Sequence, residues 1–114
     1  MSLTPAKLNF RIWKGATFKK RLTFYADEDG DVPRDLTGWS AELIIRPKAD
    51  ASPLLSLTTG DGIELDDDGN IDLYISDDDT VDITWEQGVY DLTLTDPSGD
   101  TDALVYGLFT VHGI

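Results

Sequence analysis

The chain of 114 residues contains no cysteine and a single histidine, His112. The lack of cysteine excludes disulfides, thiolate catalysis and cysteine-ligated zinc. A nucleophile–base pair usually needs a histidine, and one histidine two residues from the end of the sequence is far more often a strand-end residue than a general base. We therefore predict that the protein is not an enzyme and binds no cofactor.

Long apolar runs are also missing. No stretch approaches the roughly 18 apolar residues that a transmembrane helix requires, and the first ten residues lack the charged and apolar regions of a secretory signal. The sequence shows no internal repeat, linker or low-complexity tract, and its length is typical of one domain. We predict a single domain spanning residues 1–114, with no membrane partner.

Basic residues are absent from the second part of the chain. All nine Lys and Arg lie within residues 1–48, where six acidic residues leave a balance of +3. Residues 49–114 carry sixteen acidic residues and no basic one, so the whole chain has a net charge of −13. Such a surface repels phosphate, which excludes nucleic acid as a partner. The asymmetry favours a homo-oligomer held by complementary charge, or else serves solubility alone.

The dominant hydrophobic period is two, which indicates half-buried β-strands. Alternation is clearest in "WSAELIIR" (39–46), "IDLYIS" (71–76) and "VYDLTLT" (89–95). The segment "ALVYGLFTV" (103–111) is apolar on both faces, which predicts a central strand. Further strands are predicted at residues 8–13, 17–25, 54–58 and 63–65.

Turn residues separate these runs. Asp68-Gly69 predicts a tight hairpin, and "DPSG" (96–99) has the composition of a type I turn. Ser76 is placed to cap one short helical turn near residues 77–84, whose first positions are acidic. Seven or eight short strands at this spacing predict an all-β fold, an immunoglobulin-like antiparallel β-sandwich.

The stretch "GIELDDDGNIDLYISDDDTVD" (62–82) carries nine acidic residues and no basic one. Asp66, Asp68 and Asn70 have the alternate spacing of an EF-hand loop and are weak candidates for calcium ligands. Glycine falls at the fourth position instead of the sixth, however, and Asp77 stands where a bidentate Glu is needed. We predict no metal site and a solvated acidic surface of turns.

Exposed aromatic and basic residues are the candidates for contact with a partner. Tyr25 and Tyr74 fall on outward faces of their predicted strands, whereas Trp13 and Trp85 are expected to plug the ends of the sandwich. Lys19 and Arg21 belong to a small basic patch in "KGATFKKR" (14–21). Two alternatives remain open: a carbohydrate-binding β-sandwich that uses exposed aromatics, and an acidic mimic that binds a basic protein.

Three segments, read in order, suggest a family. They are "KGATFKKRLTFYADEDGDVPRDLTGWSAELIIRPKAD" (14–50), "GDGIELDDDGNIDLYISDDDT" (60–80) and "GVYDLTLTDPSGDTDALVYGLFTV" (88–111). Together they resemble small structural proteins of tailed bacteriophages and prophages, with an immunoglobulin-like sandwich similar to the N-terminal module of baseplate upper proteins. The positions that match its motifs are Asp35, Leu36, Thr37, Gly38, Arg46, Tyr90, Asp91, Leu92, Gly107, Phe109 and Val111.

The resemblance implies a non-enzymatic structural or adaptor protein of a phage tail, neck or baseplate. Its partners would be other virion or tail proteins, met through protein–protein contacts. Its location would be the virion, or the host cytoplasm during assembly.

Overall fold

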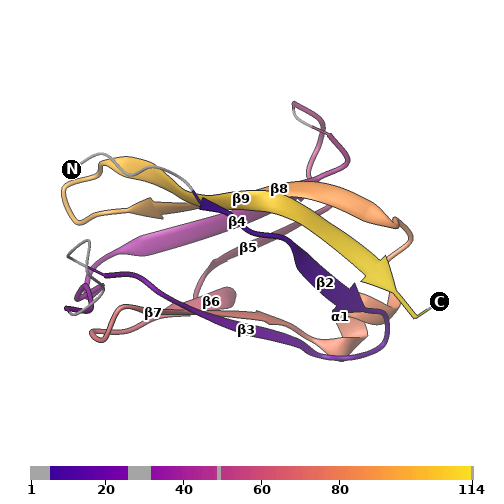
Figure 1. Ribbon diagram of the computed structural model, residues 1–114, viewed down its shortest axis with the longest axis horizontal. Helices are drawn as coiled ribbons and strands as arrows, with labels where there is room; N and C mark the ends of the chain where they lie inside the picture. The colour runs from indigo at the N-terminus through magenta and orange to yellow at the C-terminus, as the bar shows by residue number, and fades with distance from the viewer. Residues whose placement is uncertain (1–5, 26–31, 49, 114) are drawn as a thin grey trace.

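The computed structural model describes residues 6–25, 32–48 and 50–113, and shows a sandwich of two facing layers (Figure 1). The large layer contains β1 (Ala6–Lys7), β2 (Phe10–Trp13), β4 (Ser40–Arg46), β5 (Leu55–Thr59), β8 (Gln87–Thr95) and β9 (Thr101–His112). The small layer contains β3 (Phe18–Thr23), β6 (Gly62–Leu65) and β7 (Asn70–Ile75). One short helix, α1 (Asp77–Val81), connects β7 to β8.

Hydrogen bonding between strands is continuous through both layers. The order is β1-β9-β8-β4-β5-β6-β7-β3, with β2 also paired to β9. The sheet turns over between β5 and β6, which share only two residue pairs, Thr58 with Gly62 and Thr59 with Ile63. The turn brings the apolar faces of the two layers together.

Alternation along the strands builds the core between the layers. The inward residues predicted for β4, β7 and β8 are buried, apart from Trp39, which is half-buried against the core. Phe10, Phe18, Tyr90 and Phe109 form an aromatic cluster with ring centroids 4.9–5.9 Å apart. The other fully buried side chains of this core include Ile12, Leu43, Ile45, Ile63, Ile71, Leu73, Leu92 and Leu94.

The predicted all-β, immunoglobulin-like sandwich is confirmed, with differences in detail. The strand predicted at residues 8–13 is interrupted, so the described residues form nine strands instead of seven or eight. Its two parts, β1 and β2, run parallel to β9, and β5 runs parallel to β6, so the sheet is not wholly antiparallel. The predicted helical turn forms with the Ser76 cap but is shorter, Asp77–Val81. β9 lies between β8 and β1/β2, as expected for a central strand.

The interruption at Leu8 and Asn9 is held in place by three contacts. The N–H of Leu8 donates to the carbonyl oxygen of Tyr106 (2.8 Å), and the hydroxyl of Tyr90 donates to the carbonyl oxygen of Leu8 (2.6 Å). The Asn9 side chain accepts from the N–H of Leu108 (3.1 Å). Gly107 makes the close approach possible, because a Cβ there would collide with the Leu8 carbonyl oxygen.

Thr80 on α1 ties the helix to the turn between β2 and β3. Its side chain is fully buried. Its hydroxyl accepts from the N–H of Gly15 (3.1 Å) and donates to the carbonyl oxygen of Ala16 (2.8 Å). The hydroxyl therefore satisfies two backbone groups of the turn through which β2 of the large layer continues into β3 of the small layer.

Candidate interaction surface

The first acidic residues of the stretch 62–82 form a turn around the carboxylate of Asp66. One oxygen of its carboxylate accepts from the N–H groups of Asp68 and Asn70, both at 2.9 Å, and the other accepts from the Asn70 side-chain amide at 3.0 Å. The hydrogen bonds from Asn70, with a smaller one from Asp68, lower the pKa of Asp66. Gly69 supplies the positive φ (80°) that the turn between β6 and β7 requires. The carboxylate of Asp66 thus organises this turn.

Asp96 plays the same part in the turn between β8 and β9. Its carboxylate accepts from the N–H groups of Ser98 and Asp100, both at 3.0 Å, and from the Ser98 hydroxyl at 2.6 Å. These bonds, the Ser98 hydroxyl first, lower the pKa of Asp96. Gly99 again follows three residues later with positive φ (98°). Each layer therefore has one turn closed by an aspartate.

The weak metal candidates Asp66, Asp68 and Asn70 lie together in the first of these turns. There the N–H groups of Asp68 and Asn70 point at the Asp66 carboxylate and occupy its oxygens. Within residues 6–25, 32–48 and 50–113, no group of three or more His, Cys, Asp or Glu is close enough to hold a metal ion. The geometry accounts for these three residues as parts of a turn.

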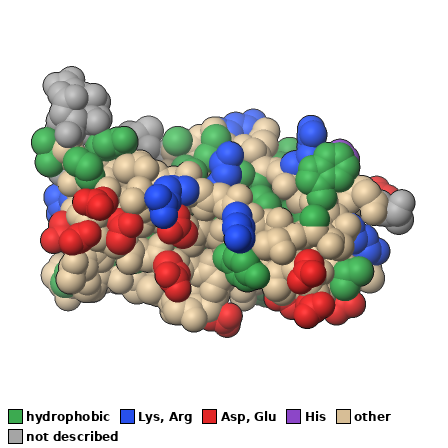
Figure 2. Space-filling view, turned by 90° about the horizontal axis from the view of Figure 1, so that it is seen from below, with side chains coloured by type: hydrophobic (Ala, Val, Ile, Leu, Met, Phe, Trp, Pro, Cys, Tyr) green, Lys and Arg blue, Asp and Glu red, His purple; other side chains and the backbone are tan. Residues whose placement is uncertain are grey.

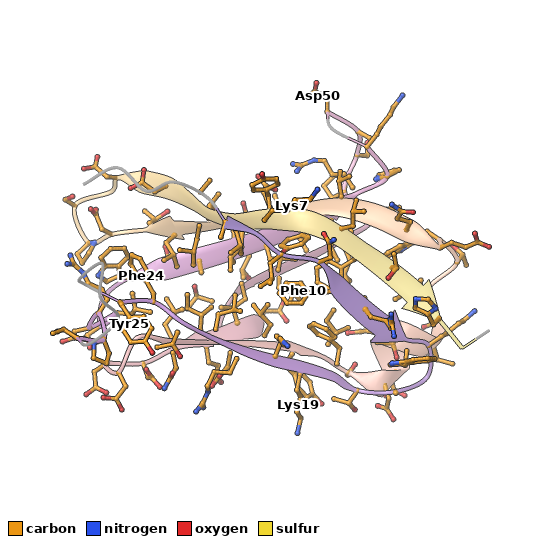
Figure 3. The ribbon with its side chains drawn as sticks, viewed as in Figure 1. Lys7, Phe10, Lys19, Phe24, Tyr25 and Asp50 are labelled. Atoms are coloured by element: carbon orange, nitrogen blue, oxygen red, sulfur yellow. The ribbon has the colours of Figure 1, made fainter. Side chains whose placement is uncertain are left out.

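Three of the four interaction candidates meet on the outer face of the small layer. Lys19 stands opposite Tyr74 in the register of β3 and β7, with its amine 5.9 Å from the ring centroid. Arg21 stands opposite Asp72 and makes two hydrogen bonds to it, at 2.7 and 3.0 Å. Figure 3 shows Lys19 directed away from the sandwich. The fourth candidate, Tyr25, is apart from them, in a bridge with Pro33 at the end of the layers.

A groove opens between β2 and β3, and we call it the β2–β3 groove. It has a volume of about 340 Å³, and three basic and no acidic side chains line it. Phe10 and Phe18 are its buried apolar part, and Trp13 is 53% exposed at its side. The full lining is Asn9, Phe10, Arg11, Trp13, Thr17, Phe18, Lys19 and Lys20. An apolar floor with basic margins is suited to an acidic partner.

The prediction for Trp13 is wrong. Trp13 does not plug the end of the sandwich, because it is in register with His112 on the outer side of β2 and β9. Its ring lies 5.3 Å from that of His112 and 5.9 Å from the guanidinium of Arg11. Trp85 is half-buried and packs against the core.

Lys20 lies on the inward side of β3, which its place in the predicted basic patch (14–21) does not indicate. It is in register with Leu73, on the side of Phe18 and Leu22. Its side chain is nevertheless exposed, because β7 is the only strand paired with β3 among the described residues. The alternation of Phe18, Lys20 and Leu22 is the signal in the sequence that places a charge on the inward side.

The charge asymmetry of the sequence becomes an asymmetry in space. Six of the nine basic residues fall within residues 7–21, along β1, β2, β3 and the turn between β2 and β3. Acidic residues gather at the turns after β6 and β8 and on α1. Figure 2 shows the outer face of the small layer with Lys and Arg in its middle and along its upper margin and acidic groups toward its two ends.

Within the described residues, no helix is long and apolar enough to span a membrane.

No family model matches the chain, and no curated protein matches it. Two similar solved structures are of voltage-gated sodium channel beta subunits. One, from photo-crosslinking analyses of their multimeric cell-adhesive interactions, has a TM-score of 0.49 and 14% identity and covers 97% of this chain and 98% of that chain. The other, parallel homodimer structures of beta4 extracellular domains that explain its role in cell–cell adhesion, has a TM-score of 0.46 and 11% identity and covers 98% of both chains.

These comparisons overturn the resemblance to phage and prophage proteins. The two structures found similar are of sodium channel beta subunits, not of phage particles, and no family model or curated protein supports a tail, neck or baseplate role. The expected virion partners and the location in a virion or host cytoplasm lose their support with it. The two alternatives, carbohydrate binding and mimicry by an acidic surface, find no support either. At 11–14% identity the likeness extends to the fold alone.

Proposed function

We propose that the protein is a non-enzymatic interaction module that self-associates through complementary charge. The β2–β3 groove of one copy would receive an acidic end of the sandwich of another. The observation that carries this proposal is the lining of the groove, with three basic side chains and no acidic one in a chain of net charge −13.

The strength of single ion pairs and the area of a standard interface set what such an interface requires. A single exposed ion pair contributes only about 0.2–1 kcal/mol, so several pairs must act together with apolar contact. Phe10, Phe18 and Trp13 supply apolar surface beside Arg11, Lys19 and Lys20. A standard interface buries about 800 Å² on each partner, on the order of a tenth of the 6886 Å² exposed by this chain. The groove and its margins are therefore the centre of such an interface and not its whole extent.

The test is the solution mass, measured by light scattering after size exclusion at low and at high salt. We expect a defined oligomer at low salt that dissociates at high salt, because salt screens exposed charges. The double change Lys19→Glu with Lys20→Glu is expected to give a monomer. Lys7→Glu with Lys48→Glu, an equal change of charge at two exposed residues that do not line the groove, is the matched control and is expected to leave the oligomer intact. A monomer under every condition rejects the proposal.

A further inference from the structure

β3 presents an open strand edge beside the β2–β3 groove. Among the described residues its one strand partner is β7. We propose that this edge binds an extended acidic segment of a partner protein, which adds to the small layer as a further strand. The inference rests on the proposed function only in using the same basic groove as a contact surface.

Backbone N–H and C=O groups of β3 that do not bond to β7 face the open side, where an added strand could pair with them. The N–H of Phe24 donates to the carbonyl oxygen of Gly69 (2.8 Å), in continuation of the register of β3 with β7. In an antiparallel pair, residues alternate between facing the partner and facing away. The N–H and C=O groups of Lys19, Arg21 and Thr23 therefore face away from β7. An added strand can pair with these groups, as in recognition by strand addition.

The side chains of this edge select for acidic residues. Lys19, Lys20 and Arg21 are consecutive, so basic groups stand on both faces of the edge. Side chains of an added strand also alternate between the two faces, and would meet Lys20 on one face and the other two on the opposite face. Arg21 already bonds Asp72 and Lys19 lies over Tyr74, so Lys20 is the charge that an incoming carboxylate meets most directly.

The same charges exclude other occupants. If β3 paired with β3 of a second copy about a two-fold axis, the three basic residues would stand opposite one another, and like charges placed so are destabilising. An apolar strand would cover Lys20 without providing it a counter-charge. An inward-pointing charge of this kind is a known protection of edge strands against unwanted pairing. An acidic segment avoids both penalties. The occupant is therefore a partner of different chemistry from the edge itself.

Binding is tested first with a short fluorescent peptide that alternates Glu and Val, by anisotropy, at chain concentrations where light scattering shows a monomer. We expect Lys20→Glu to weaken binding about tenfold or more, since it turns an attraction into a repulsion. Lys48→Glu is the matched control and is expected to bind as the unchanged chain does. A peptide that alternates Lys and Val is expected not to bind.

Two further measurements distinguish strand addition from attraction by charge alone. The peptide is made with alternate amides N-methylated in each of the two possible phases, and one phase is expected to abolish binding because it removes the donors that face β3. Hydrogen exchange is expected to slow at the amides of Lys19 and Arg21 on binding, whereas the amide of Lys20, directed at β7, is already protected.

Each outcome has a separate meaning. If both N-methylated peptides bind as tightly as the parent peptide, strand addition is wrong. If the Glu peptide fails to bind while self-association persists, the inference fails and the proposed function stands. If the peptide binds with the expected exchange pattern but the chain is always a monomer, the inference holds and self-association fails.

Discussion

The two layers of the sandwich end differently on the side where β2 continues into β3. In the large layer β1 and β2 cover the edge of β9, and the inward residues Phe10 and Ile12 are buried. In the small layer, the part of the chain that the structure describes leaves the other edge of β3 open, and the first inward residues of β3 are Phe18 and then Lys20. One edge is closed by apolar packing, and the other is kept soluble by charge.

The closed edge depends on a close approach of two backbones, and the open edge does not. The contact of Leu8 with β9 requires Gly107 and the hydroxyl of Tyr90, whereas β3 needs only its register with β7. Thr80 holds the turn between the two edges. Substitutions at the closed edge should therefore cost stability, and substitutions at the open edge should change association.

The largest effect is expected from Gly107→Ala. The added Cβ collides with the Leu8 carbonyl oxygen, so either β1 leaves β9 or the backbones separate. Overpacking of this kind costs about 3 kcal/mol of unfolding free energy, measurable by urea denaturation. Hydrogen exchange at Leu8, whose N–H bonds Tyr106, should accelerate. An unchanged midpoint with a protected Leu8 would show that the close approach is not required.

Thr80→Val should rank second. Valine keeps the shape of the side chain but removes the hydroxyl that pairs with Gly15 and Ala16. Losing these two hydrogen bonds costs about 1–3 kcal/mol, at about 0.5–1.5 kcal/mol for each. The matched change Thr84→Val, at an exposed residue after α1, should alter the urea midpoint little. Equal effects of the two changes would contradict the role assigned to Thr80.

Tyr90→Phe isolates the hydrogen bond at the closed edge from its packing. The ring stays in the aromatic cluster, and only the bond to the Leu8 carbonyl oxygen (2.6 Å) is lost. The expected cost is about 1 kcal/mol, with faster exchange in β1 and not in β8. A loss of protection throughout the large layer would mean that Tyr90 stabilises more than this edge.

Lys20→Leu should change stability least, within about 0.5 kcal/mol, because the side chain is exposed. Its effect should be on association, since it removes the inward charge from the open edge. We expect growth of light scattering with time and concentration, which Lys48→Leu should not produce. A variant as soluble as the unchanged chain would show that Lys20 does not protect β3.

Much of the fold follows from local pattern. Alternation alone predicts that Leu43, Leu73 and Leu92 point inward, and all three are buried. Asp68-Gly69 marks the turn between β6 and β7, and Ser76 caps the helix as its position predicts. These features depend on contacts within a few residues, or on a period of two that any half-buried strand must show.

The arrangement of the surface residues is harder to predict from the sequence than the strands are. Exposure and charge single out Tyr74, Lys19 and Arg21, but only the register of β3 with β7 brings them together. Trp13 is mispredicted because a tryptophan near a strand end looks the same in sequence whether it faces the core or the solvent. The sequence predicts a turn at Asp68-Gly69, but only the structure shows that the Asp66 carboxylate organises this turn by accepting from the N–H groups of Asp68 and Asn70.

Residue order alone therefore specified most of the strands, their buried faces and the turns between them, because each depends on neighbours close along the chain. It also specified the imbalance of charge, which is a matter of composition. Tertiary structure decided that β1 and β2 close the edge of β9, that β7 is the one strand paired with β3 among the described residues, and that Arg11, Lys19 and Lys20 line one groove. Those outcomes join residues about a hundred positions apart, such as Phe10 and Phe109. No local period encodes which strand edges meet, since only the packing of the two layers selects among the possible pairings.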